Sequence, residues 1–203
     1  MKKLSLLLLI VLVAFTSGCG AAADKNANAM EIKKDGSVTV TSVSSFDKKY
    51  YSADELKEEA QAEIKAYNEK AGEEKIKLRQ CSAGQNTARI VIFYSSYKDY
   101  CSFNNSELYI GTLQSALDEG IADSGTSVLD SDQDLRTTLG ELARKKTTYG
   151  FIKVTEGLLV RTPGKIVYVS QGTSLDKDGN AQAGGKEDTG SVLESPCYII
   201  YEE

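Results

Sequence analysis

Short segments in which apolar and polar residues alternate recur along the chain, and this pattern predicts β-strands. Segments 30–33 and 37–43 flank an Asp-Gly pair at 35–36 that is typical of a tight hairpin turn. Segments 75–81 and 88–94 are separated by a turn-prone stretch and predict a second hairpin. Further strands are expected at 107–111, 150–155, 157–162, 165–170 and 197–201.

Two segments instead repeat apolar residues every three or four positions, which predicts amphipathic helices. The first begins at the capping residue Ser52, runs to about Lys70 and ends before Gly72. The second spans 134–146, where an acidic first turn and a basic last turn suit the helix dipole. The apolar faces consist of Leu56, Ala60, Ile64 and Tyr67 in the first helix and of Leu135, Leu139, Leu142 and Ala143 in the second.

The order of these elements favours an α+β fold with a largely antiparallel β-sheet and two main amphipathic helices. The strands follow one another through hairpin-length connections, which a parallel βαβ sheet does not allow. A shorter helix is expected at 112–119, and a long exposed loop or a frayed hairpin end at 176–190. Residues 29–203 are long enough for one core, so we expect a single domain.

The N-terminal segment 1–18 has a different pattern. Lys2 and Lys3 precede a largely apolar run at 4–15, and small polar residues follow it. The run is too short to span a bilayer, which takes about twenty apolar residues. This layout is typical of a secretory signal peptide.

The end of this segment resembles the lipobox of bacterial lipoprotein precursors, because Thr16, Ser17 and Gly18 stand directly before Cys19. The resemblance implies cleavage before Cys19, a diacylglycerol on its thiol, and attachment to the extracytoplasmic face of the cell membrane. Two or three acyl chains hold a small domain at a bilayer. The small polar residues 19–28 are then expected to form a flexible tether.

Charge narrows the choice of partners. The formal net charge is −5, and removal of Lys2 and Lys3 with the signal segment makes it −7. An acidic domain lacks the basic footprint that binds phosphate backbones, so nucleic-acid binding is not expected. The lipid on Cys19, and not the protein surface, is the expected source of membrane affinity.

The chain contains no histidine, which excludes Ser-His-Asp and Cys-His catalysis. Ser95 and Lys98 fit the S-x-x-K pattern of penicillin-binding enzymes, but no K-T-G strand accompanies them, and a polar turn explains them as well. A hydrolase would otherwise depend on paired carboxylates, which sequence spacing does not identify. Neither a phosphate-binding loop nor a dinucleotide fingerprint occurs, so no cofactor is expected.

Two acidic clusters resemble calcium ligands without the glycine that a calcium loop requires. The first comprises Asp130, Asp132, Asp134 and Glu141, and we interpret it as the acidic start of the second helix. The second comprises Asp176, Asp178 and Asn180, and we interpret it as a β-turn. No metal site is therefore expected.

Beyond the anchor, three cysteines remain: Cys81, Cys101 and Cys197. One disulfide with one spare thiol is compatible with an extracytoplasmic location, and its pairing has three alternatives. The alternative, which fits the sequence equally well, is that all three are small buried hydrophobic residues.

The leading hypothesis is a lipid-anchored lipoprotein with a non-catalytic binding, structural or accessory role in the cell envelope. Its partner would be an envelope protein or a glycan. The alternatives are an envelope hydrolase that uses carboxylates or Ser95 and Lys98, and a small-molecule or glycan capture protein. Eleven tyrosines would serve the capture protein, but core packing is our preferred interpretation of Tyr94, Tyr97 and Tyr100.

Overall fold

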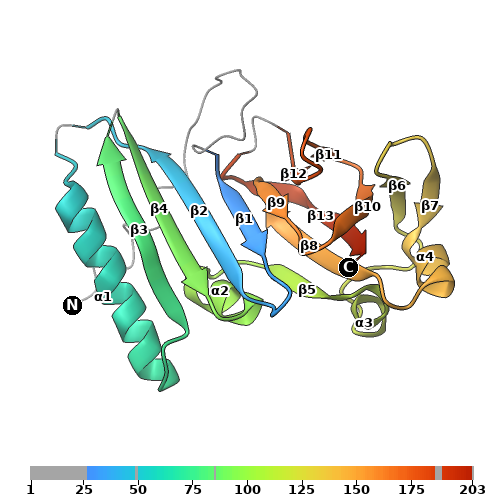
Figure 1. Ribbon diagram of the computed structural model, residues 1–203, viewed down its shortest axis with the longest axis horizontal. Helices are drawn as coiled ribbons and strands as arrows, with labels where there is room; N and C mark the ends of the chain where they lie inside the picture. The colour runs from blue at the N-terminus through green and yellow to red at the C-terminus, as the bar shows by residue number, and fades with distance from the viewer. Residues whose placement is uncertain (1–26, 49, 85, 186–188, 203) are drawn as a thin grey trace.

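The computed structural model describes residues 27–48, 50–84, 86–185 and 189–202 of the chain. Within them, thirteen strands form two mostly antiparallel sheets, and four helices accompany the sheets. The two sheets follow one another along the longest axis of the molecule (Figure 1). The α+β fold that the sequence predicts is confirmed. No helix of these ranges is long and apolar enough to cross a membrane.

The first sheet has seven strands and contains both predicted N-terminal hairpins. Its order is β11 (Thr173–Leu175), β12 (Ala181–Ala183), β9 (Leu159–Arg161), β1 (Ala29–Ile32), β2 (Val38–Ser45), β4 (Thr87–Tyr94) and β3 (Ile76–Gly84). Only the β1–β9 pair is parallel among its ladders. At the β1–β2 turn, Gly36 has a φ of 80°, and an Asp35 carboxylate oxygen accepts hydrogen bonds from the Ser37 backbone and hydroxyl. The Asp-Gly pair therefore makes the tight turn that it predicts.

The second sheet has six antiparallel strands. Its order is β5 (Leu108–Thr112), β8 (Gly150–Glu156), β13 (Val192–Glu202), β10 (Lys165–Ser170), β6 (Ser127–Asp130) and β7 (Arg136–Thr138). From β8 to β13 the chain passes repeatedly between the two sheets. One buried cluster includes residues of both sheets, among them Met30, Ile152 and Ile199. The sheets consequently share a core.

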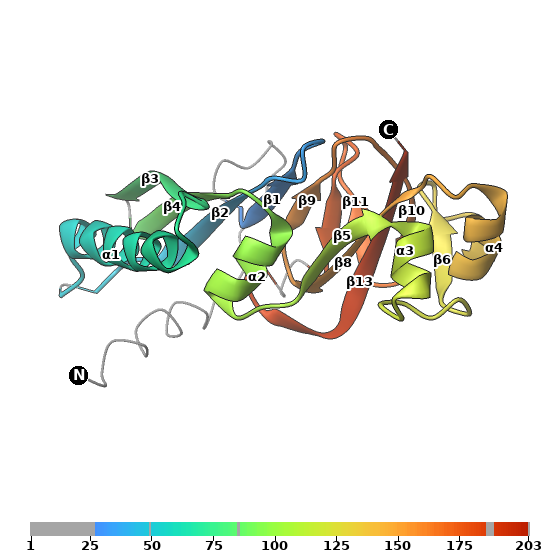
Figure 2. The same cartoon turned by 90° about the horizontal axis from the view of Figure 1, so that it is seen from below.

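The longest helix, α1 (Ala53–Ala71), begins and ends where its capping residues predict. The Ser52 side chain accepts from the Glu55 backbone, and Gly72 adopts the left-handed conformation that ends the helix. Its apolar stripe buries Ala60 and Ile64. Figure 2 shows α1 on one side of the seven-stranded sheet, and α2 (Tyr97–Asn104) on the same side. The short helices α3 (Leu113–Asp118) and α4 (Leu139–Lys145) pack near the six-stranded sheet.

Several boundaries differ from the prediction. The helix expected over 134–146 begins only at Leu139, because the residues before it form β7 and the tip of the β6–β7 hairpin. The Asp130 carboxylate accepts the backbone N–H groups of Asp134 and Leu135 and so stabilises this turn. Leu135, assigned to the apolar stripe, is 69% exposed. The loop expected over 176–190 contains the strand β12.

Candidate functional site

The side of the seven-stranded sheet away from α1 and α2 is the most distinctive surface of the chain. Alternation along each strand sends every second side chain to this side. The register aligns these side chains across neighbouring strands: Lys77, Phe93, Thr39, Glu31 and Arg161 form one row, and Gln80, Val91 and Thr41 begin the next. We name this surface the open face and define it by Glu31, Thr39, Thr41, Val43, Lys77, Arg79, Gln80, Ser82, Arg89, Val91, Phe93 and Arg161.

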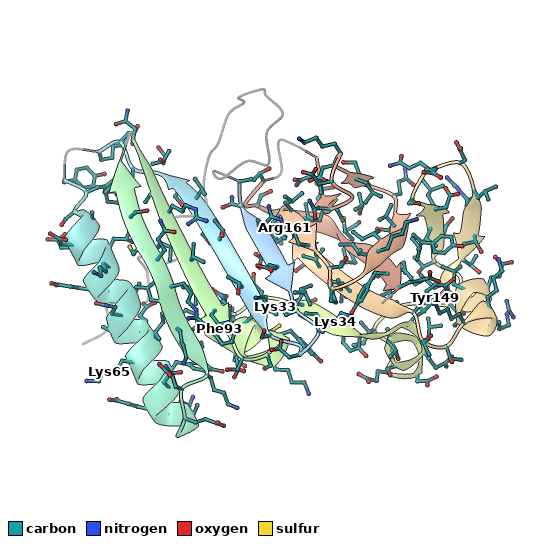
Figure 3. The ribbon with its side chains drawn as sticks, viewed as in Figure 1. Lys33, Lys34, Lys65, Phe93, Tyr149 and Arg161 are labelled. Atoms are coloured by element: carbon teal, nitrogen blue, oxygen red, sulfur yellow. The ribbon has the colours of Figure 1, made fainter. Side chains whose placement is uncertain are left out.

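The other side of the same strands belongs to the core. There, Ile76, Tyr94, Val38 and Met30 are at most 2% exposed. Ile64 of α1 belongs to the same buried cluster. None of the four helices covers the open face, on which Figure 3 labels Phe93 and Arg161. Over β3, β4 and β2 this side has no covering layer and is available for a partner, whereas Ala29 and Leu159, which continue the second row on β1 and β9, are buried.

Two arginines of the open face contact neighbouring side chains of the same face. The Arg79 guanidinium lies over the Phe93 ring, 5.0 Å from its centroid. The Arg89 guanidinium donates hydrogen bonds to the Gln80 side chain and to the Thr41 hydroxyl, the latter at 3.4 Å. These contacts restrict the side chains before any partner arrives, which reduces the entropic cost of binding.

The open face is basic although the whole chain is acidic. Its charged residues are four cations, Lys77, Arg79, Arg89 and Arg161, and one carboxylate, Glu31. Lys77 also forms an ion pair with Glu74 at 2.6 Å. Helix α1 has the opposite balance, with six acidic residues against three lysines. The two sides of this sheet layer therefore differ in the sign of their charge.

A second surface, next to α4, is concave. Its volume is about 550 Å³, and it is lined by Leu135, Arg136, Thr137, Glu141, Arg144, Lys145 and Tyr168. The Glu141 carboxylate is already engaged, because it accepts from the Thr137 hydroxyl at 2.7 Å and from the Thr138 backbone at 3.1 Å. These hydrogen bonds lower the pKa of Glu141. A carboxylate that is engaged and stabilised in its charged form is a poor general acid, so Glu141 is a poor candidate for that role.

The predicted Ser95 and Lys98 pair does not share a helical turn. Helix α2 begins at Tyr97 with Ser96 as its N-cap, so Ser95 precedes the helix. The Lys98 ammonium lies over the Tyr97 ring, 5.9 Å from its centroid. The polar turn expected over 95–98 is present only at Ser95 and Ser96, because Tyr97 to Asn104 form a helix. Capping by Ser96, whose hydroxyl accepts from the Asp99 backbone, is the signal that could have located it.

The tyrosines at intervals of three belong mostly to the core. Tyr94 is 2% exposed and Tyr100 is 4% exposed, which confirms core packing for these two. The Tyr100 hydroxyl donates to the Glu156 carboxylate at 2.8 Å. The Tyr94 hydroxyl accepts from the Asn104 side chain at 3.1 Å. They are therefore not part of an exposed aromatic platform.

The three cysteines of the described residues are free thiols. Cys81 lies on β3, Cys101 on α2 and Cys197 on β13. Burial raises the pKa of Cys81 and of Cys101, which keeps both in the neutral form at neutral pH. Cys19, the predicted lipidation site, lies outside the described residues.

Neither acidic cluster forms a metal site in the described part of the chain. The Asp176 carboxylate accepts from the backbones of Asp178 and Asn180 and from the Asn180 side chain. Burial alone would raise the pKa of Asp176, but these hydrogen bonds outweigh it and lower the pKa. The predicted β-turn at this position is confirmed, since it connects β11 to β12.

Comparison with protein-family models, with curated proteins and with solved structures yields no match for this chain.

Proposed function

We propose that this chain is a lipid-anchored protein of the bacterial cell envelope that binds an acidic partner protein on its open face, without catalysis. The apolar segment at 4–15 and the lipobox-like residues before Cys19 support export and lipidation. The short polar stretch 20–28 would then keep the domain close to the bilayer.

The observation that carries the proposal is the uncovered, basic open face on an otherwise acidic chain. A basic surface attracts an acidic one and orients it during encounter. The partner would therefore present an acidic surface of matching width to the cations of β3, β4 and β9.

The chemistry of the face favours a protein over a glycan. Arginine and aromatic side chains are enriched among residues that dominate protein–protein binding energy. Arg79 stacked on Phe93 is such a pair, and Val91 is its neighbour along β4. Small-molecule and glycan sites are commonly concave, whereas these groups lie on the surface of a sheet.

Site-specific crosslinking in cells tests this proposal. A photo-reactive residue at Val91, in the full chain, is expected to capture one protein of defined mass, and one at Glu58 on α1 is expected not to. Arg79→Glu should reduce the Val91 adduct at least several-fold. Lys65→Glu makes the same charge change on α1, where the Lys65 side chain is 76% exposed, and should leave the adduct unchanged.

Each contrary result is decisive. Equal adducts with Arg79→Glu and Lys65→Glu would show that the basic face does not select the partner. An adduct whose added mass is removed by glycosidases would identify a glycan and overturn the protein partner. Absence of any adduct from Val91 in cells that contain the membrane-bound chain would remove the open face as the binding site.

A further inference from the structure

Three aromatic side chains gather in the connection between β2 and α1. The Phe46 and Tyr51 rings lie 4.8 Å apart, and the Tyr50 and Tyr51 rings lie 5.0 Å apart. Tyr50 is 77% exposed and Tyr51 is 41% exposed, so these rings pack on one another at the surface. We name Phe46, Tyr50 and Tyr51 the aromatic tip. Contact of this much apolar ring surface with water is unfavourable, and packing of the core does not require it.

The aromatic tip lies at the end of the sheet where the tether enters. Asn28, the residue before β1, is fixed on both sides: its side chain accepts from the Val43 backbone at 2.7 Å, and its carbonyl accepts from the Leu159 backbone at 3.0 Å. Phe46 follows Val43 by three residues, which is about 10 Å along a strand. The C-terminal end of β2 and the N-terminal end of β1 both lie at the upper edge of the sheet in Figure 1.

The tether is too short to take this end far from a membrane. Asn28 follows Cys19 by nine positions. A fully extended chain spans at most about 3.5 Å per residue, or about 30 Å in all. With Cys19 in the bilayer, Asn28 stays within that distance, and Phe46 of the aromatic tip follows three residues after Val43, to which Asn28 is hydrogen-bonded. The tip is thus held at high local concentration next to the lipid surface.

We propose that the aromatic tip docks into the interface of the bilayer that holds the lipid anchor. This inference rests on the lipidation of Cys19 in the proposed function. Tyrosine has an apolar ring and a polar hydroxyl, and it is enriched at the boundary between lipid headgroups and acyl chains. The tip and the anchor together fix the domain at two points. The N-terminal end of β1 and the C-terminal end of β2 then face the membrane.

The absence of tryptophan from the chain allows a direct test. Tyr50→Trp places a single fluorophore in the aromatic tip. Lys33→Trp places one at the exposed β1–β2 turn, at the other end of the same strands, and serves as the control. Each full-length lipidated variant is purified from membranes and reconstituted into phosphatidylcholine vesicles with and without brominated acyl chains. Circular dichroism checks that each variant is folded.

Docking predicts that the indole emission of the Tyr50→Trp variant shifts to shorter wavelength in vesicles. Brominated lipid should quench this emission several-fold more strongly than the emission of the Lys33→Trp variant. If both variants float with the vesicles but the tip fluorophore is quenched no more than the control fluorophore, the docking inference is wrong while the anchor stands. If both are quenched equally and strongly, the domain lies flat and the proposed orientation is wrong. If neither variant is recovered in the membrane fraction, the anchor fails, and the docking inference fails with it.

Discussion

The Arg79 guanidinium lies over the Phe93 ring, 5.0 Å from the ring centroid, across the pair of strands at the edge of the seven-stranded sheet. A register shift between Leu78 and Gln80 gives Arg79 this position, since the extra residue bulges from β3. A charge and a bulge on an edge strand discourage further strand pairing. The open face is therefore available to side-chain recognition, while the adjacent backbone edge is protected.

The Arg79–Phe93 contact should be measurable as a coupling energy. Arg79→Gln and Phe93→Leu are each expected to lower the free energy of unfolding, and together they should lower it by about 0.5 kcal/mol less than the sum, as for an exposed cation–π pair. Urea unfolding of the single and double variants provides the cycle. Arg79→Lys, which keeps the charge, should retain part of the coupling. Strict additivity of the two substitutions would show that the contact contributes nothing.

The Tyr100–Glu156 hydrogen bond connects α2 to β8 of the six-stranded sheet. Tyr100→Phe leaves the ring in place but removes the donor from a carboxylate, so we expect a loss of about 1.5–3 kcal/mol in the free energy of unfolding. Glu156→Gln keeps an acceptor at this position and should cost less. Denaturant unfolding of both variants measures the difference. A Tyr100→Phe chain as stable as the parent would show that the bond is not stabilising.

Three buried tyrosines should make the fold sensitive to alkali. Burial and the nearby Glu119 carboxylate together raise the pKa of Tyr109 to about 12. Burial also raises the pKa of Tyr94 and of Tyr100 above the ordinary value, and the Glu156 carboxylate contributes to both shifts. The unfolded chain releases these protons near pH 10, earlier than the folded chain. The contribution of these tyrosines to the free energy of unfolding is thus complete below about pH 10, and it is lost as the pH rises from 10 toward 12. Thermal unfolding at pH 8, 10 and 11 should show a steepening decline, which Tyr109→Phe should reduce.

Local signals in the sequence predict the elements that are governed by local chemistry. The Asp-Gly turn at 35–36, the Ser52 cap and Gly72 each fix a boundary through hydrogen bonds or backbone conformation within a few residues. Alternation in 75–81 and 88–94 likewise predicts two strands with distinct sides. These predictions are confirmed because no distant contact competes with them.

The elements that the sequence does not predict depend on distant contacts or on competing local bonds. At 134–138, helical spacing predicts helix, but the Asp130 carboxylate binds two backbone N–H groups and favours a hairpin tip. The parallel pairing of β1 with β9 joins residues more than a hundred positions apart. The composition of a strand does not indicate which distant strand it pairs with.

The open face was predictable only in part. Alternation places Arg89, Val91 and Phe93 on one side of β4, but it does not reveal which side the helices cover. That choice depends on the packing of Ile64 and its neighbours against the opposite side. The basic character of the face is also hidden in a net charge of −5, because its cations come from β3, β4 and β9.

Replacement of Cys19 by serine removes the thiol that a diacylglycerol would modify. The Cys19→Ser chain is therefore expected to leave the membrane fraction for the medium or the periplasm. Three aromatic side chains alone bind a bilayer weakly and reversibly, since even a single myristoyl chain gives only marginal attachment. Cys101→Ser removes a thiol of the folded domain and should leave membrane attachment unchanged, which makes it the matched control. Fractionation followed by immunoblotting measures both variants. Retention of Cys19→Ser at the membrane would overturn lipid anchoring, and equal release of the two variants would point to misfolding in place of a missing lipid.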